Sequence, residues 1–482
     1  MAQSGQKVDD LVVSSNFIRA VRESGYLSLS TALAELVDNA LQAEATEVAI
    51  TIKREEANGL PTITVTDNGI GMTRSELEAC LRFGGSSRFD TRHSFGRFGM
   101  GLPAASLSQA RRVEVTSWRS RSEYQVALDV DAITQGRSAS LTARRVGASR
   151  GASGTRVRWL QCDRIEYRRL AWLDRAIHRD LGRMYRRFLR DGVTVTINGA
   201  KVVPFDPMLL DATVEDGRAT LAFEPLAYEL ETASGDAATV TVRFSMLPVH
   251  AWHHLDNVTK RRVGIVGQGG VSILRARREI ASGWHLMGGK RKENYDDWWR
   301  CEIEFDPILD EHFGITINKQ GIRPSQTLKD ALEPELESVA RLLNARVRQA
   351  FEEVKFQAAA EASCQIASSA DRDLPVIGSR GGGGALRYRL QSEPLPIDAM
   401  FRQALRSRTL ALTLNVDHPA FAALYEPLHG LEGEAGTRLR TALELFLLSF
   451  ARSAAQMERA GQPCDELLQT WSATYGRMLQ KV

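Results

Sequence analysis

Cysteine is scarce in this chain, and its five copies lie far apart in the sequence. None stands in a CxxC pair or in a cluster with histidine, which argues against a disulfide framework and a structural zinc site. Long apolar runs are also missing, and the polar start MAQSGQKVDD lacks the pattern of a signal peptide. We therefore expect a soluble cytoplasmic protein with no membrane partner.

An excess of charge of either sign is absent as well, because 62 Lys and Arg face 59 Asp and Glu. The distribution is uneven, with fourteen Arg and no Lys between residues 144 and 190 and a second basic stretch between 260 and 292. Such stretches are usually solvated faces. Interleaved with aromatic residues they also suit contacts to a phosphate backbone, so DNA is a candidate partner. A GC-rich genome is a third explanation for Arg in place of Lys.

The 482 residues are enough for two to four domains of mixed α+β class, and no internal repeat is present. Strand-like alternation and helical periodicity divide the chain into blocks, and a Gly-rich break separates the last of them. The expected segments are an α/β sandwich over 1–200, a second α/β domain over 201–335, a connecting helix over 336–366, a flexible linker over 367–389 and a helical domain over 390–482.

Two short stretches in the first block carry unusual polar residues. ELVDNALQA, residues 35–43, follows a helical apolar pattern in which Glu35 and Asn39 share one face, where a solvated surface is the simplest explanation. TVTDNGIGM places Asp67 at a strand end, directly before Gly69 and Gly71. A carboxylate there can accept a hydrogen bond from a flat ligand close to the backbone, although a surface turn uses the same residues.

A third stretch, GRFGMGLPAAS, sets three glycines before an expected helix start. Such a loop presents backbone N–H groups to phosphates. It is not a Walker loop, because no GK[ST] follows, and it lacks the preceding strand of the dinucleotide fingerprint. Each motif alone is weak. ExxxN, DxGxG, GxxGxG and then Gly154-Thr155 nevertheless follow one another within about 120 residues.

This order of motifs resembles the Bergerat fold of the GHKL ATPase superfamily, which includes gyrase B, the ninety-kilodalton heat-shock chaperone, histidine kinases and MutL. ELVDNALQAEATEV and FGRFGMGLPAAS look most like the MORC and heat-shock-chaperone branch. The resemblance covers about the first 200 residues. It implies that ATP and Mg²⁺ are bound there, and that the second α/β domain acts as a transducer.

The resemblance also assigns roles to individual residues. Asn39 would coordinate Mg²⁺, and Glu35, one turn earlier on the same face, would act as general base. Asp67 would bind the adenine amino group, with Thr155 bonding the same carboxylate or a shared water. The remaining ATP contacts would be Gly69, Gly71 and Met72 at the base, Ser86, Ser87 and Arg88 in a lid, and Gly96, Arg97, Phe98, Gly99, Met100, Gly101 and Leu102 around the phosphates.

In several of these relatives a second domain supplies a cation to the γ-phosphate. Lys319, in the loop of ITINKQGIR, is the expected counterpart, with Gln320 and Arg323 as weaker candidates. Two positions depart from the pattern: Gln42 replaces a common Asp, and Pro103 follows the glycine loop where MORC proteins often carry Lys. We therefore expect slow hydrolysis.

The first functional hypothesis is an ATP-gated homodimeric clamp on DNA, of MORC or MutL type, with a role in bacterial defence. The alternatives are a chaperone-like clamp on an unidentified protein partner, and a nucleotide-binding module without turnover. A histidine kinase is disfavoured because only 34 residues precede Glu35. DNA cleavage of gyrase type is disfavoured because the last 150 residues lack an acidic metal cluster.

Overall fold

The chain forms two compact units, Met1–Asn344 and Ala345–Val482. No helix in the ranges given below is long and apolar enough to cross a membrane. The computed structural model describes residues 14–26, 28–54, 59–85, 99–119, 121–135, 141–148, 152–165, 170–215, 217–232, 234–315, 321–377, 385–395, 399–430 and 433–481.

An eight-stranded sheet with the order β5-β4-β3-β6-β2-β1-β7-β8 forms the centre of the amino-terminal domain. Its strands β1 and β2 pair antiparallel from Val48↔Asp67 to Arg54↔Pro61, as expected of a hairpin. Alternate side chains of these strands are buried, which matches the apolar alternation of the sequence. The strands are β1 (Glu47–Arg54), β2 (Pro61–Asp67), β3 (Arg112–Trp118), β4 (Ser122–Asp129), β5 (Arg144–Ala148), β6 (Gly154–Leu160), β7 (Thr194–Ile197) and β8 (Ala200–Lys201).

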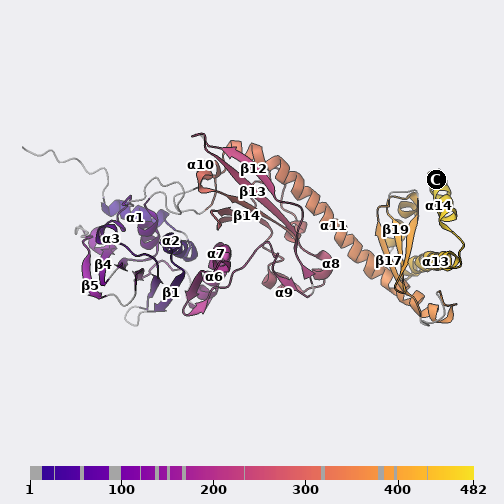
Figure 1. The fold of residues 1–482 in the computed structure, drawn as a ribbon, viewed down its shortest axis with the longest axis horizontal. Helices are drawn as coiled ribbons and strands as arrows, with labels where there is room; N and C mark the ends of the chain where they lie inside the picture. Colours follow the sequence, from indigo (N-terminus) through magenta and orange to yellow (C-terminus); the bar gives the residue numbers. More distant parts are fainter. Residues whose placement is uncertain are drawn as a thin grey trace, which may run out of the picture. The chain divides into compact units, whose positions relative to one another are not determined.

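Helices cover this sheet, and α2 packs against both α4 and α6 (Figure 1). The Arg-rich residues 170–190 form two helices, α6 and α7, interrupted at the buried Tyr185. The helices are α1 (Ser14–Ser24), α2 (Leu29–Gln42), α3 (Arg74–Ala79), α4 (Gly101–Gln109), α5 (Val130–Thr134), α6 (Leu170–Met184) and α7 (Arg186–Arg190).

The second domain of the same unit contains a six-stranded sheet with the order β11-β13-β16-β14-β15, and β12 also pairs with β13. Its strands are β11 (Thr220–Leu221), β12 (Leu226–Glu231), β13 (Ala237–Met246), β14 (Gly270–Arg275), β15 (Arg278–Gly283) and β16 (Trp299–Phe305). A separate pair is β9 (Thr213–Val214) and β10 (Gly217–Arg218). The helical turns are α8 (Val249–Trp252), α9 (Asn257–Val263), η1 (Asn294–Trp298), η2 (Pro307–Leu309) and α10 (Asp310–Phe313).

A single helix, α11 (Gln326–Ala370), begins in the first unit and ends in the second. Its first part lies along the second domain's sheet, where the indole Nε1 of Trp299 donates to Asn344 at 2.8 Å (Figure 1). The helix ends at Ala370, inside the stretch 367–389 expected to be a linker, and a 3-10 turn, η3 (Asp371–Asp373), follows.

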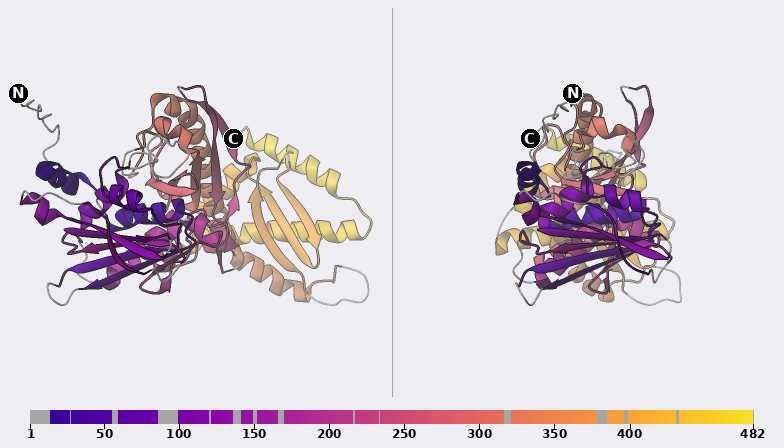
Figure 2. Two further views of the ribbon diagram at one scale, coloured as in Figure 1. Left: turned by 60° about the vertical axis from the view of Figure 1, so that its left-hand side comes forward. Right: turned by 90° about the vertical axis from the view of Figure 1, so that its left-hand side faces the viewer.

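The second unit is largely helical, and it also contains a three-stranded sheet that the sequence reading did not foresee (Figure 2). In this sheet β19 lies between a parallel and an antiparallel neighbour. Phe401 on the sheet packs with Phe450 and Trp471 of two helices. The elements are β17 (Arg387–Glu393), β18 (Phe401–Arg406), β19 (Thr409–Asn415), a π-helix (Phe421–Tyr425), α12 (Glu426–Gly430), α13 (Glu434–Arg459) and α14 (Asp465–Leu479).

Candidate functional site

Helix α2 places Glu35 at the start of the candidate site. The helix is capped by Ser28, whose side chain accepts from the N–H of Thr31, and its apolar face forms part of the core. Glu35 is only 5% exposed, and the hydroxyl of Tyr26 donates to its Oε2 at 3.2 Å. Burial, together with the negative charge of Glu35, raises the pKa of Tyr26, so this phenol stays a proton donor to the carboxylate.

The carboxylate of Glu35 lies directly against the first residue of α4. A Cβ on Gly101 would be 1.8 Å from Oε1 of Glu35, so only glycine fits there. Met100, the N-cap residue of α4, makes no side-chain capping hydrogen bond. The backbone N–H groups of this first turn and the positive end of the helix dipole therefore face the same space as the carboxylate.

Asn39 lies one helical turn after Glu35, on the same face of α2. It is half-buried, and its side-chain amide makes no hydrogen bond to a described residue. Two neighbours behave differently: Asp38 is fully buried on another face of the helix, and Gln42 stands half-buried in the last turn. Within the described ranges the amide oxygen of Asn39 is thus available next to Glu35, and its role at magnesium stays a prediction.

Asp67 ends β2, and a tight turn follows. Its Oδ1 accepts the N–H of Gly69 at 2.9 Å, and its β6 partner in the register is Thr155. Burial raises the pKa of Asp67, and the backbone N–H groups of Gly69 and Thr155 only partly offset this. Backbone N–H groups therefore hold the carboxylate of Asp67, and no described cation pairs with it. This environment suits the carboxylate to bind a neutral hydrogen-bond donor.

The backbone around Asp67 is packed so closely that side chains are excluded. Gly71 has φ +68°, and a Cβ on it would lie 2.3 Å from the carbonyl oxygen of Trp118. A Cβ on Gly69 would lie 2.6 Å from the carbonyl oxygen of Ala43, just after α2. Close packing at Gly69 and Gly71 thus holds the turn after β2 against the end of α2 and against β3. It thereby sets the position of Asp67 relative to Asn39.

Ser117 belongs to this site and was missed by the sequence reading. Its hydroxyl accepts the N–H of Met72 at 2.9 Å and lies 3.2 Å from the hydroxyl of Thr155. Thr155 also faces Ser117 across the β3–β6 register. A serine in RRVEVTSW gives no motif by itself, and only the pairing of β3 with β6 brings it beside DNGIGM.

Part of the predicted site lies outside the described residues. This applies to Ser86, Ser87, Arg88, Gly96, Arg97 and Phe98, and to Lys319 and Gln320 in the second domain. A hydrogen bond joins the described residues on the two sides of the first gap, because the N–H of Gly84 donates to the carbonyl of Gly99 at 3.1 Å. Beyond the second gap, the N–H of Arg323 donates to the carbonyl of Phe313 at 2.9 Å.

The second domain enters the neighbourhood of α2 through Arg278, the first residue of β15. Its guanidinium Nε lies 2.9 Å from Oδ1 of Asp38, and the hydroxyl of Tyr185 donates to the same oxygen at 2.7 Å. Arg278 and Asp38 are both buried. These residues were not among the sequence candidates, because they are brought together from positions far apart in the chain.

Three arginines of α6 and α7, part of the stretch between residues 144 and 190, form ion pairs with buried acids, whereas others such as Arg175 and Arg179 are exposed. Arg186 binds Glu279 at 2.6 Å and Glu302 at 2.7 Å, and Arg187 binds Glu302 at 2.5 Å. Arg183 binds Glu279 at 2.5 Å. The aligned cations of α6 and α7 therefore fasten the amino-terminal domain to acids of the second domain's sheet.

The second basic stretch is also partly internal. Arg275 binds Asp310 at 2.6 Å, and Lys290 binds Asp296 at 2.7 Å, both in buried pairs. Arg261 and Arg262 on α9, and Arg291 and Lys292 in the following loop region, are instead exposed. None of these four forms an ion pair with an acid in the described ranges, so they are the cations of this stretch available to a partner.

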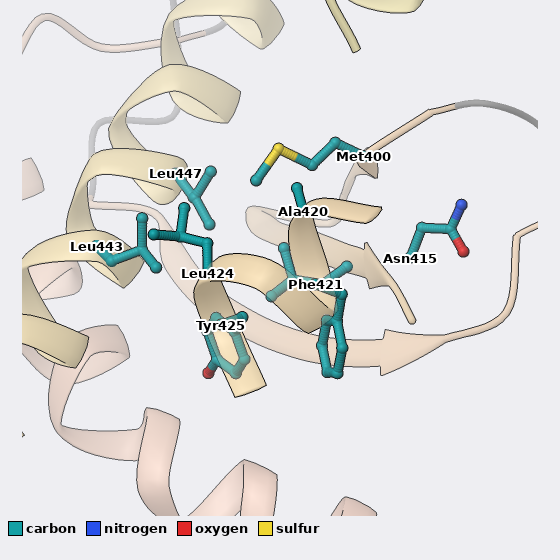
Figure 3. Close-up of a pocket in the computed structure, with 9 residues that line it drawn as sticks. Met400, Asn415, Ala420, Phe421, Leu424, Tyr425, Leu443 and Leu447 are labelled. Atoms are coloured by element: carbon teal, nitrogen blue, oxygen red, sulfur yellow. The ribbon is translucent and has the colours of Figure 1, made fainter. Parts of the chain in front are cut away.

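A cavity in the second unit offers no comparable chemistry. Eight of its nine lining side chains are apolar or aromatic, and Asn415 is the exception (Figure 3). The amide of Asn415 is already bonded to the backbone, accepting from Leu395 and donating to Ala399. In the described part of the chain, no group of three or more His, Cys, Asp or Glu side chains is arranged to hold a metal.

Glu35 and Asn39 on α2 and Asp67 at the end of β2 all lie within one stretch that matches a known family. Residues 27–151 match the family described as histidine kinase-, DNA gyrase B-, and HSP90-like ATPases. The amino-terminal domain is therefore a GHKL ATPase domain, with MutL and MORC ATPases among its relatives. The predicted superfamily and the mixed α and β fold class are confirmed.

Individual relatives are similar over short stretches. A protein named DNA mismatch repair protein MutL from Beijerinckia indica is 34% identical over 105 residues, which cover 21% of this chain and 16% of that protein. ATPase MORC2B from Mus musculus is 40% identical over 78 residues, 16% of this chain and 8% of its own. MutL from Macrococcus caseolyticus is 40% identical over 89 residues, 17% and 13% respectively. The chain thus spans less than a fifth of each of these relatives.

Proposed function

We propose that this chain binds Mg²⁺-ATP at the α2–α4 junction and hydrolyses it slowly. The observation that carries the proposal is the close approach of the Glu35 carboxylate to Gly101 in the first turn of α4, with the amide of Asn39 one turn further along α2. A carboxylate beside backbone N–H groups can take a proton from a water that attacks a phosphate held by those groups.

The remaining residues fit the same ligand. Asn39 would hold Mg²⁺ through its side-chain oxygen, and the ion would neutralise phosphate charge. The carboxylate of Asp67 would accept the amino group of adenine, in a wall that Gly69 and Gly71 keep free of side chains. Thr155 and Ser117 would fix the orientation of that wall through their hydroxyl contact.

Two substitutions on α2 test this assignment. We expect Glu35→Gln to reduce the rate of ATP hydrolysis by about 100-fold or more while ATP still binds, because only the base is removed. Asn39→Ala should weaken Mg²⁺-dependent ATP binding itself, as measured by calorimetric titration. Glu44→Gln, at an exposed position just after the same helix, is the matched control and should leave both quantities nearly unchanged. Undiminished hydrolysis by Glu35→Gln would refute the assignment.

We further propose that ATP closes a homodimer, which acts as a clamp on DNA. The support is the family of the amino-terminal domain and the exposed cations of α9 and the following region. Lys292 donates to the carbonyl of Gly269 at 3.3 Å, and Arg300 donates to the carbonyl of Gly264, directly after α9, at 2.6 Å. The first contact joins the segment of Arg291 and Lys292 to the loop that follows α9, and we propose that Arg261, Arg262, Arg291 and Lys292 form one basic patch.

Binding of labelled duplex DNA, followed by fluorescence anisotropy across a salt series, tests this patch. The double substitution Arg261→Gln/Arg262→Gln should weaken binding and reduce the slope of log K against log salt by about 0.9 per lost phosphate contact. Arg175→Gln/Arg179→Gln, on the exposed side of α6, removes the same charge and is the control. Equal losses in both variants would show a nonspecific charge effect and remove the patch from the proposal.

The dimer has a separate test. Light scattering with a non-hydrolysable ATP analogue should show a doubled mass that Asn39→Ala does not reach. If the dimer forms and hydrolyses ATP but shows no salt-dependent DNA binding, the clamp acts on a protein client instead, which is the alternative that the sequence left open.

A further inference from the structure

The hairpin of β14 and β15 has an unusual turn, which lies against the amino-terminal domain. Arg275 pairs with Arg278 in the register, so the turn consists of Ala276 and Arg277 alone. Both residues have positive φ, 46° and 71°, although neither is Gly or Asn. Such a backbone costs on the order of 1 kcal/mol per residue and persists where surrounding contacts hold it.

Those contacts come from the amino-terminal domain. The guanidinium of Arg277 pairs with Asp191 and lies 5.6 Å from the ring centroid of Phe188. Arg278, the next residue, pairs with Asp38 at 2.9 Å and donates to the hydroxyl of Tyr185 at 3.3 Å. The turn is therefore fastened at two points, an exposed one at Arg277 and a buried one at Arg278.

The buried contact reaches the helix of the proposed active site. Asp38 is three residues after Glu35 on α2, and Arg278 is within electrostatic range of both acids and of Tyr26. Arg278 is only 5% exposed, so its ion pair with Asp38 is shielded from water.

We propose that Arg278 is a positioning residue for ATP hydrolysis: by pairing with Asp38 it ties α2, and with it the carboxylate of Glu35, to the second domain. This inference rests on the proposed ATPase function. In it, Glu35 is held in its working orientation only while the β14–β15 hairpin is docked, so docking of the second domain and hydrolysis are coupled. Lys319 and its loop are not involved, since Arg278 acts through α2 and does not touch nucleotide.

Steady-state kinetics on the full-length chain tests the proposal. We expect Arg278→Gln to lower kcat by roughly 10- to 100-fold, the size of effect that a misplaced catalytic group produces, with KM changed less than about threefold. Arg278→Lys keeps the cation and should recover part of kcat. Asp38→Asn should lower kcat to a similar extent, and combining it with Arg278→Gln should add little, because the two residues form one unit.

Arg277→Gln is the matched control, because it loosens the same turn without touching α2. It should retain nearly full kcat, and thermal melts must show that each variant is folded. If Arg278→Gln fails to fold, Asp38→Asn and Arg278→Lys carry the test. Unchanged kcat in folded Arg278→Gln, or an equal fall in Arg277→Gln, overturns the inference. Absence of hydrolysis by the unmodified chain would instead overturn the proposed function, so the two failures are distinguishable.

Discussion

At the scale of single residues, Gly71 shows how the backbone near Asp67 limits substitution. Alanine there meets two penalties, a positive φ of 68° and a Cβ 2.3 Å from the carbonyl oxygen of Trp118. Gly59 has the same φ of 68° but nothing within 4 Å of its Cβ position, so alanine meets only the first penalty.

We therefore expect Gly59→Ala to lower the free energy of unfolding by about 1 kcal/mol and Gly71→Ala by about 3 kcal/mol or more. Only Gly71→Ala should also weaken ATP binding, since relief of the clash displaces the turn that carries Asp67. Urea denaturation and nucleotide titration measure the two effects. Equal losses of stability in the two variants would mean that the clash with the carbonyl oxygen of Trp118 contributes nothing to the free energy of unfolding.

The site shows which residues a sequence can identify and which it cannot. Glu35, Asn39 and Asp67 stand in local motifs whose spacing already implies a shared face or a strand end, and the structure places them accordingly. Ser117 and Arg278 have no such spacing. Each reaches the site only through pairing between distant segments, and residue order alone does not specify that pairing.

At the scale of elements, α1 is attached to the amino-terminal domain by the apolar side chains of Phe17 and Ile18 and by a buried arginine. Arg22 donates to the carbonyls of Leu107 and Ala110, at 3.1 and 2.7 Å, and binds Asp163 at 2.8 Å. Burial would raise the pKa of Asp163, but hydrogen bonds from Arg22 and Arg111 outweigh it, and the pKa of Asp163 is lowered. Its ionised form therefore stabilises the fold.

The sign of the pH dependence follows from this. A lowered folded pKa gives stability that is complete above the unfolded value, near 3.9, and lost as pH falls through the folded one. We expect Asp163→Asn to destabilise the chain by about 1 kcal/mol at pH 7, because the pair is partly solvated. The difference should stay constant down to about pH 5 and vanish in stronger acid. A difference that grew with acid would contradict the role of the carboxylate.

Two hairpins explain what the sequence reading missed among the elements. The turns Ala276-Arg277 and Ser407-Arg408 both have positive φ at two residues without Gly or Asn. Sequence rules detect two-residue turns by those residue types, as they did for Asn198-Gly199 after β7. The β14–β15 and β18–β19 hairpins therefore carried no turn signal, and the sheet of the second unit was read as helix.

The same limit applies to the arginines of α6 and α7. Their spacing predicts a basic helical face, and this face exists. Its partners, Glu279 and Glu302, lie about 100 residues later in the chain, so composition could not distinguish an internal ion network from a surface for DNA.

At the scale of the whole molecule, each of the two units has a buried glutamate at the centre of its own polar network. In Met1–Asn344, Glu302 binds Arg186, Arg187 and Arg243, at 2.7, 2.5 and 3.1 Å. Burial would raise the pKa of Glu302, but these cations outweigh it and lower the pKa. In Ala345–Val482, the fully buried Glu444 accepts from Ser363 and Tyr425, both at 2.5 Å.

These two networks allow each unit to be destabilised separately. We expect differential scanning calorimetry to resolve two unfolding transitions, since each unit has its own core. Glu302→Gln leaves three buried or half-buried cations short of a partner and should weaken the first unit by about 3–5 kcal/mol. Glu444→Gln leaves hydroxyl contacts poorly matched and should weaken the second by about 1–3 kcal/mol.

Each substitution should lower one transition and leave the other in place, so each serves as the control for the other. A single transition that both substitutions lower together would show that α11 couples the units into one cooperative structure, because this helix is the element that continues from one into the other.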